Sequence, residues 1–335
     1  MRVLEAVGAG LEFEEFPWSC ALYERTGQMM PHDAIEVLRG FDAIYLGAVG
    51  WPSVPDHISL WGLLLPIRQQ LNLSVNLRPV KLLPGVQSPL LTHDRSSVDM
   101  AFVRENTEGE YSGAGGRVHP DSEDEVAVET SVFTRRAIEK AARYAFDLAR
   151  RRRRHLINVT KSNASRHAYV FWDQVVEGMG ASYPDVEVER VLVDAMAARM
   201  VTHPETIDVA IGSNLFGDIL TDLGAAIQGG MGVAASANLN LAGDQPSLFE
   251  PVHGSAPDIA GKNRANPIGA IMTAALMLEH LGASRLAARV EEAVAEVTAQ
   301  GASLTGDLGG SASTTELGEA VLAALRGLPA SEAVR

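Results

Sequence analysis

Residues 214–222 read Asn-Leu-Phe-Gly-Asp-Ile-Leu-Thr-Asp and directly follow an apolar run at residues 207–211 that predicts a strand. If the stretch is helical, Asn214, Asp218 and Asp222 lie four residues apart and share one face. Two carboxylates stacked in this way repel each other unless a cation lies between them, and oxygen ligands suit Mg²⁺ or Mn²⁺. The alternative is an acidic face in solvent, although the apolar residues between the acids favour a half-buried helix.

Apolar runs and helical patterns alternate on both sides of this stretch, which predicts an α/β fold. Asp194 ends one such run, and strand ends are where α/β proteins place ligands. Residues 110–131 break the alternation, are rich in glycine and acids, and predict a hairpin-like arm. The expected strands are residues 41–47, 98–103, 155–160, 188–193 and 207–211, and the expected helices are residues 136–150, 167–178, 266–281 and 284–298.

Composition excludes several classes of protein. The 335 residues carry 28 Lys plus Arg against 42 Asp plus Glu, a formal net charge of −14, which argues against nucleic-acid binding. We expect no membrane span, because no apolar run approaches the length that one needs. The single cysteine, Cys20, excludes an internal disulfide framework and fits a reducing cytoplasm. The N-terminus lacks the features of a secretory signal peptide.

Three arginines, Arg68, Arg78 and Arg104, each lie beside an apolar run in this acidic chain. Guanidinium groups bind carboxylates bidentately, so a cluster of three suits a substrate with two carboxylates. A surface ion pair is the alternative for each arginine, and the sequence does not show whether they converge. Tyr111 and Lys161 are further candidates, although either taken alone is typical of a surface residue.

The segment Phe249–Lys262 (FEPVHGSAPDIAGK) contains a loop of small residues. Such a loop allows the backbone to approach a phosphate closely. It is neither a Rossmann G-x-G-x-x-G motif nor a P-loop. From the residues alone, a phosphate-binding loop and a tight structural turn remain equally open.

In combination, the NLFGDILTDL and FEPVHGSAPDIAGK segments resemble the β-decarboxylating dehydrogenases, the isocitrate, isopropylmalate and tartrate/D-malate dehydrogenase family. The resemblance covers nearly the whole chain. It implies a two-domain α/β fold with an open mixed sheet flanked by helices. One domain would comprise residues 1–73 plus 230–335 on the cofactor side. The other, residues 74–229, would bind substrate and metal, form the dimer, and carry a β arm at about residues 112–132.

The resemblance also implies a metal- and NAD-dependent oxidation and decarboxylation of a small 2-hydroxy dicarboxylic acid, such as tartrate or D-malate. Asp218 and Asp222 of one subunit, with Asp194 of its partner, would hold Mn²⁺ or Mg²⁺ in an obligate homodimer. K⁺ is an additional candidate cation. The substrate carboxylates would contact Arg68, Arg78 and Arg104. Lys161 from the partner would act as the base for the hydroxyl proton, and Tyr111 would protonate the enol carbon after CO₂ is lost.

By the same resemblance, the GSAPDIAGK loop, together with Asn266, binds the adenosine half of the cofactor. Asp258 would accept hydrogen bonds from the adenosine ribose, and its negative charge would disfavour the 2′-phosphate of NADP. The implied cofactor residues are Glu250, His253, Gly254, Ser255, Ala256, Asp258 and Asn266. Trp61 lies where isopropylmalate enzymes carry residues shaped for an isopropyl group, which favours a smaller substrate.

One feature departs from the family pattern. Family members begin with a strand and a GDGIG turn, whereas Met1 here opens directly on a helical pattern at Val3, Leu4 and Val7. We therefore expect the first strand to be missing. Two alternatives to the tartrate/D-malate hypothesis remain open: a 3-isopropylmalate dehydrogenase, and a shortened, non-catalytic family member.

Overall fold

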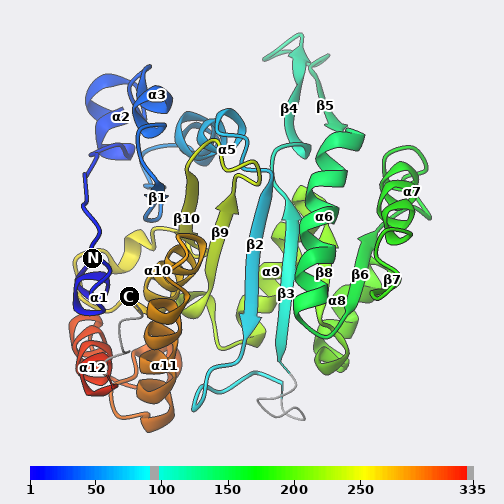
Figure 1. The fold of residues 1–335 in the computed structure, drawn as a ribbon. Coiled ribbons are helices and arrows are strands. Elements are labelled where there is room, and N and C mark those ends of the chain that lie inside the picture. The colour runs from blue at the N-terminus through cyan, green and yellow to red at the C-terminus, as the bar shows by residue number, and fades with distance from the viewer. Residues whose placement is uncertain (91–97, 330–335) are drawn as a thin grey trace.

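An open sheet of eight strands forms the centre of the molecule in a computed structural model that describes residues 1–90 and 98–329. The strands lie in the spatial order β1-β10-β9-β2-β3-β8-β6-β7 (Figure 1). Their bounds are β1 Ala43–Tyr45, β2 Val75–Lys81, β3 Asp99–Glu105, β6 His155–Thr160, β7 Glu187–Leu192, β8 Val209–Gly212, β9 Ala235–Leu239 and β10 Ser247–Pro251.

The sheet is mixed, as the sequence predicts. Strands β3, β8, β6 and β7 are parallel neighbours, and β1 is parallel to β10. The central strands β10, β9, β2 and β3 pair in antiparallel fashion. All five expected strands are confirmed. Strands β2, β9 and β10 were not expected, because buried polar residues interrupt their apolar pattern.

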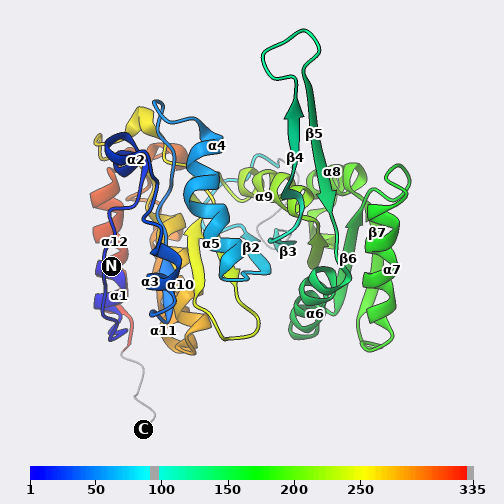
Figure 2. The ribbon, with the colours of Figure 1, turned by 90° about the horizontal axis from the view of Figure 1, so that it is seen from above.

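Helices cover both faces of the sheet, and those expected from the sequence are confirmed at α6, α7, α10 and α11. Figures 1 and 2 show α6 on one face and α8 and α9 on the other. The helices are α1 Arg2–Ala6, α2 Cys20–Thr26, α3 Ala34–Leu38, α4 Asp56–Ser59, α5 Leu65–Gln70, α6 Arg135–Arg151, α7 Ala168–Gly180, α8 Val193–Thr202, α9 Asn214–Ile227, α10 Ile268–His280, α11 Ser284–Gln300 and α12 Thr314–Gly327. A π-helical turn, Leu60–Leu64, joins α4 to α5.

The expected arm is present as a two-stranded antiparallel ribbon, β4 Gly109–Val118 and β5 Val126–Val132. Figure 2 shows it extending away from the sheet on the same side as α8 and α9. Its valines Val118, Val126 and Val128 are each about half exposed, so the arm has an apolar surface with no cover in the single chain.

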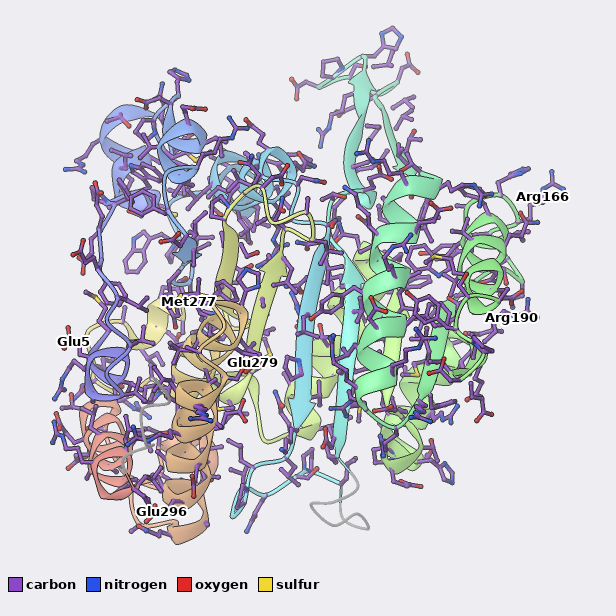
Figure 3. The ribbon with its side chains drawn as sticks, in the orientation of Figure 1. Glu5, Arg166, Arg190, Met277, Glu279 and Glu296 are labelled. Atoms are coloured by element: carbon purple, nitrogen blue, oxygen red, sulfur yellow. The ribbon has the colours of Figure 1, made fainter. Side chains whose placement is uncertain are left out.

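The ends of the chain pack together, because α1 contacts α12 (Figure 1). Figure 3 shows the opposite ends of the molecule, with Glu5 and Glu296 on the side of α1 and α11 and with Arg166 and Arg190 on the side of α7.

Cys20 is a free, buried cysteine. Among the described residues, no helix has the length and hydropathy needed to cross a membrane. The two-domain division stays a prediction.

Candidate active site

The registers of four strands place polar side chains in one row on the α9 face of the sheet. Arg104 of β3 lies opposite Gly212 of β8 on one side and Asn76 of β2 on the other. Asn76 in turn lies opposite Asn238 of β9. Residues that are paired across neighbouring strands point to the same face, so these side chains form a continuous line beneath α9.

Helix α9, which the sequence predicts, begins over this row. Its N-cap is Ser213, whose Oγ accepts a hydrogen bond from the backbone N–H of Phe216 at 3.4 Å. Asn214 lies in the first turn, and its Oδ1 accepts from both Nε (2.9 Å) and Nη2 (2.7 Å) of Arg104. The fork geometry of the guanidinium group therefore fixes Arg104 to the start of α9.

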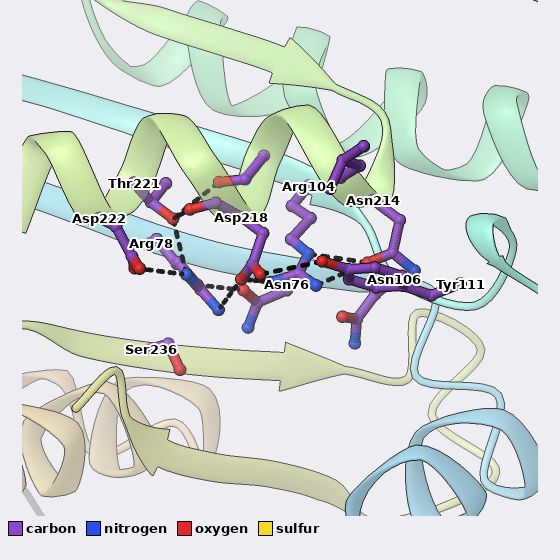
Figure 4. A network of polar contacts seen from close by, with 12 residues as sticks. Asn76, Arg78, Arg104, Asn106, Tyr111, Asn214, Asp218, Thr221, Asp222 and Ser236 are labelled. Atoms are coloured by element: carbon purple, nitrogen blue, oxygen red, sulfur yellow. Dashed lines mark hydrogen bonds and ion pairs between the residues drawn. The ribbon is translucent and has the colours of Figure 1, made fainter. Parts of the chain in front are cut away.

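Asp218 is the point at which the charged side chains meet (Figure 4). Its carboxylate accepts from Nη1 of Arg104 and lies 3.2 Å from Nη2 of Arg78. Burial alone would raise the pKa of Asp218, but the positive charges of Arg104 and Arg78 outweigh it and lower that pKa below its ordinary value. Asp218 is therefore an ionised, partly buried carboxylate.

Asp222 lies one turn further along α9 and is more exposed, with 58% of its side chain accessible compared with 35% for Asp218. Its Oδ1 is 3.8 Å from Nη1 of Arg78. Burial and the neighbouring Asp218 charge raise the pKa of Asp222. The predicted shared face of the two acids is confirmed. Repulsion across one helical turn adds to the effect of burial at Asp222, whereas the arginine charges dominate at Asp218.

Arg68 of α5 approaches from the other side and forms a buried ion pair with Glu250 of β10, at 2.6 Å between Nη2 and Oε1. Its charge contributes to lowering the pKa values of Arg78, Arg104 and Asp218, so the three arginines share one electrostatic environment. The Nε of Arg68 is buried and has no hydrogen-bond partner among the described residues. An orphaned cationic donor of this kind is expected where a ligand oxygen completes the hydrogen bonding.

Tyr111 of β4 points into the same cluster (Figure 4). Its hydroxyl donates to Oδ2 of Asp218 at 3.3 Å, and the guanidinium carbon of Arg104 lies 5.6 Å from its ring centroid. Burial, followed by the Asp218 charge, raises the pKa of Tyr111, so the phenol keeps its proton at neutral pH. The arm therefore delivers a neutral hydroxyl group beside the aspartates.

Trp61, in the π-helical turn, closes against the arm. An added Cβ at Gly113 of β4 would lie 2.5 Å from Cη2 of Trp61, and Gly113 has φ +73°. The indole thus packs directly on the arm backbone two residues after Tyr111, and only glycine permits this approach without strain. Trp61 nevertheless remains 42% exposed.

Lys161 and Asp194 form a separate pair, with Nζ 2.7 Å from Oδ1. The hydrogen bond from Lys161 lowers the pKa of Asp194, whose side chain is exposed. Among residues 1–90 and 98–329, no group of three or more His, Cys, Asp and Glu side chains lies close enough to hold a metal ion. Within one chain, Asp194 does not join Asp218 and Asp222, so its role as a metal ligand stays a prediction.

The predicted cofactor loop follows β10 and is mostly exposed. His253 bonds to the carbonyl of Gly254 at 3.0 Å, and Ala256 adopts φ +45° at the start of a short helical turn, Pro257–Ile259, that contains Asp258. Ser255 approaches the β1–α4 connection, since an added Cβ at Gly50 would lie 3.5 Å from its Oγ. These residues therefore surround one exposed backbone loop, which suits a polar, phosphate-bearing ligand.

Asn266 and Glu250 differ from the rest of the cofactor set. The Asn266 amide accepts from the N–H of Ile268 at 2.9 Å and donates to Asp307 at 2.9 Å, so it braces the loop against α10. Glu250 is buried against Arg68. The cofactor roles of all these residues stay predictions, and two of them also have structural roles.

The site contains residues that the sequence analysis missed. Thr221 accepts from Nη1 of Arg78 at 2.6 Å, and Asn76 accepts from Nε of the same arginine at 2.6 Å. Asn106 and Asn238 are buried beside them. A signal was available in the segment Ala235–Leu239, where serine and asparagine alternate with apolar residues on a fully buried strand. Buried polar side chains that recur every second residue mark a polar face of a sheet.

The donor set fits a divalent cation and an organic dianion together. Three guanidinium groups, Arg68, Arg78 and Arg104, face three carboxylates, Glu250, Asp218 and Asp222. The three positive and three negative side chains give the site a net charge of about zero, and a dication bound together with a dicarboxylate leaves that net charge unchanged. Each bound charge is therefore compensated by an opposite one. Two carboxylates that share a helix face, one of them accessible, are also the oxygen donors that Mg²⁺ and Mn²⁺ prefer.

Comparison with known proteins identifies the family to which the sequence shows a resemblance. Residues 1–321 match the family model described as isocitrate/isopropylmalate dehydrogenase. The chain is 51% identical to a probable tartrate dehydrogenase/decarboxylase of Bacillus subtilis, with 96% of this chain and 90% of that protein covered. It is 49% identical to the D-malate dehydrogenase (decarboxylating) of Escherichia coli, with 96% and 92% covered.

The fold comparison supports this result. A crystal structure of isocitrate dehydrogenase from Methylococcus capsulatus superposes with a TM-score of 0.88 at 35% identity, covering 97% of this chain and 94% of that one. The family, the mixed sheet and the arm expected from the sequence are therefore confirmed. The chain therefore belongs to the isocitrate/isopropylmalate dehydrogenase family.

Proposed function

We propose that this protein oxidises and decarboxylates a small 2-hydroxy dicarboxylic acid, tartrate or D-malate, with NAD and a divalent metal. The main structural support is that Arg78 and Arg104 converge on the face of α9 that carries Asp218 and Asp222, with Arg68 nearby. Relatives that are about half identical over almost the full length are named for tartrate and D-malate, which supports this substrate class.

Substrate binding follows from the arginines. The three guanidinium groups provide planar donor pairs for the two carboxylates, and the orphaned Nε of Arg68 provides an additional donor. Burial of Arg78 and Arg104 strengthens these contacts, because the local dielectric is lower than that of water. The substrate hydroxyl would then lie beside Asp218 and Asp222.

When bound, Mn²⁺ or Mg²⁺ would supply Lewis-acid polarisation of the oxygen on the reacting carbon, and NAD would supply the hydride acceptor. Asp218 and Asp222 would hold the metal, and the exposed loop around Asp258 would hold the adenosine half of the cofactor. The carboxylate of Asp258 repels a 2′-phosphate, so we propose NAD rather than NADP.

Two side chains move protons. Lys161 would accept the substrate hydroxyl proton during oxidation. Tyr111, whose phenol stays protonated, would donate a proton to the substrate carbon after CO₂ leaves. Both groups need to reach the same substrate, although Lys161 and Tyr111 lie in different clusters of the single chain.

The separation of these clusters supports a homodimer with shared active sites. Lys161 and Asp194 of one subunit would complete the Asp218–Asp222 site of the other. The exposed apolar side chains Val201 of α8 (44%) and Ile219 of α9 (58%) lie on the adjacent helices and would be covered in such a dimer. A cytoplasmic location and a role for K⁺ stay predictions.

The direct test is an assay of reduced nicotinamide formation. Purified protein is supplied with NAD and, in separate reactions, with D-malate, tartrate, 3-isopropylmalate or isocitrate. Each reaction is run with Mn²⁺ and after chelation, and NADP replaces NAD in a parallel series. We expect the highest kcat/KM with D-malate or tartrate, loss of activity after chelation, and a preference for NAD.

The same assay decides between the alternatives. A preference for 3-isopropylmalate would contradict the smaller substrate that Trp61 favours, and equal rates after chelation would contradict the metal assignment. We expect Trp61→Leu, which removes the ring beside Gly113, to raise the rate with 3-isopropylmalate relative to D-malate. Trp51→Leu, which removes another exposed indole, serves as the control.

A further inference from the structure

A chain of buried amides connects two of the site arginines across the centre of the sheet. Nε of Arg78 donates to Oδ1 of Asn76 at 2.6 Å, and Nδ2 of Asn76 donates to Oδ1 of Asn238 at 3.1 Å. Nδ2 of Asn238 then donates to Oε1 of Glu250 at 2.9 Å, and that oxygen also accepts from Arg68 at 2.6 Å. Arg68 and Arg78 thus bind the two ends of one continuous hydrogen-bonded path.

Asn238 is the central member of this path, and its amide is fully used. Its Oδ1 accepts from Asn76 and, at 2.9 Å, from Nδ2 of Asn106, while its Nδ2 also donates to the carbonyl of Leu248 at 3.2 Å. Asn238 and Asn76 have no exposed surface. The amide orientation is therefore fixed, since a flipped Asn238 would set its NH₂ group against two other NH₂ groups.

From Arg78 through Asn76 and Asn238, the donors point the same way, toward the carboxylate of Glu250, which accepts from Arg68 on its other side. Hydrogen bonds arranged in one direction polarise one another, and in a buried site such a network has one favoured geometry. The path also crosses from β2 to β9 and β10, which the sequence analysis assigned to different domains. A change at its centre would therefore alter how Arg78 lies relative to Arg68.

We propose that Asn238 is a positioning residue for dicarboxylate binding, which sets the distance and orientation between Arg78 and Arg68 without touching the substrate. This proposal rests on the function proposed above, because it assumes that the two arginines bind carboxylates. Asn238 is uncharged and fully buried, so neither its charge nor its exposure indicates this role.

The chain offers a matched control in Asn240. It lies two residues after Asn238, on the same face, and is also buried, but its amide bonds only to backbone groups: the carbonyl of Leu71 at 2.9 Å and the N–H of Gly243 at 2.8 Å. Asn238→Ala and Asn240→Ala each remove a buried, hydrogen-bonded amide. We expect both variants to lose thermal stability, and only the first to lose arginine alignment.

The experiment measures the dissociation constant for succinate by calorimetry, without cofactor or turnover, in the full-length wild type and both variants. We expect Asn238→Ala to weaken succinate binding by about tenfold or more, the size of effect that follows when a charged hydrogen-bond partner is misplaced. Asn240→Ala should leave the succinate constant within about twofold of wild type. With D-malate, Asn238→Ala should raise KM by a larger factor than it lowers kcat.

The conservative variant Asn238→Asp keeps the side-chain volume, and it replaces Asn238→Ala should that variant not fold. It removes the donor to Glu250 and sets a second carboxylate against it, so it should also weaken succinate binding. Unchanged binding in any folded Asn238 variant, or an equal loss in Asn240→Ala, would overturn the proposal. If wild type binds no succinate and does not oxidise D-malate, the proposed function itself fails, which is a distinguishable outcome.

Discussion

Gly217 of α9 packs directly on the side-chain stem of Arg104: an added Cβ at position 217 would lie 2.5 Å from Cβ and 2.6 Å from Cγ of Arg104. The glycine of the NLFGDILTD stretch therefore sets how closely α9 approaches the sheet. That approach allows Asn214 and Asp218, which flank the glycine on the helix, to bond to the same guanidinium group.

We expect Gly217→Ala to displace Arg104 and to lower kcat/KM for D-malate by at least about tenfold, because small misplacements in a site are costly. Overpacking a buried position costs about 1–3 kcal/mol, and alanine regains about 1 kcal/mol of helix propensity. The net loss of unfolding free energy should thus reach at most about 2 kcal/mol in chemical denaturation. Gly318→Ala on α12 meets nothing within 4 Å and should be neutral or stabilising, and equal activity in both variants would contradict this account.

Asp218→Asn should abolish metal-dependent stabilisation. A cation that binds only the folded state at about 100 times its dissociation constant adds about 2.7 kcal/mol of stability, which thermal unfolding with and without Mn²⁺ detects. The amide keeps the size of the side chain but loses the charge on which Arg78 and Arg104 converge. Asp185→Asn removes an exposed carboxylate that pairs with Arg150, and it should keep the full Mn²⁺ effect. A full Mn²⁺ shift in Asp218→Asn would place the metal elsewhere.

Mixed subunits test the shared active site. Lys161→Ala and Asp218→Asn should each be inactive alone, yet a one-to-one mixture, unfolded and refolded together, should recover about a quarter of wild-type activity. Half of the dimers are then mixed, and each of these holds one intact site. Lys161→Ala mixed with Asp194→Asn should recover nothing, because both changes fall on the same side of every site. Recovery in the second mixture, or in neither, would contradict the dimer model.

Glu105, at the end of β3, provides a pH-dependent stability test. Burial raises its pKa, and hydrogen bonds from Thr107 and Glu108 only partly oppose this effect. Above the ordinary glutamate pKa of about 4.3, Glu105 has lost its proton in the unfolded state but keeps it in the folded state. The free energy of unfolding therefore falls as the pH rises from that value through the raised pKa of the folded state. Urea unfolding at a series of pH values should show that Glu105→Gln makes the unfolding free energy less dependent on pH in this range than in the wild type. An exposed control, Glu129→Gln on the arm, should leave the slope unchanged.

Local patterns determined much of this protein in advance. The spacing of Asn214, Asp218 and Asp222 depends only on helical periodicity, so the acidic face of α9 was predictable from the sequence. The alternation of apolar runs predicted strand β3, which carries Arg104, and strand β6, which Lys161 directly follows. The NLFGDILTDL and FEPVHGSAPDIAGK segments together predicted the family, although the residues alone left the role of the small-residue loop open.

The tertiary structure decided which charges meet. Strand register, which depends on pairing between segments distant in the chain, aligns Asn76 with Arg104 and with Asn238. No local pattern encodes that alignment, and β2, β9 and β10 were missed because their inward side chains are polar. The sequence therefore specified the chemical groups, and the long-range packing of α9 on the sheet determined their distances, charges and partners.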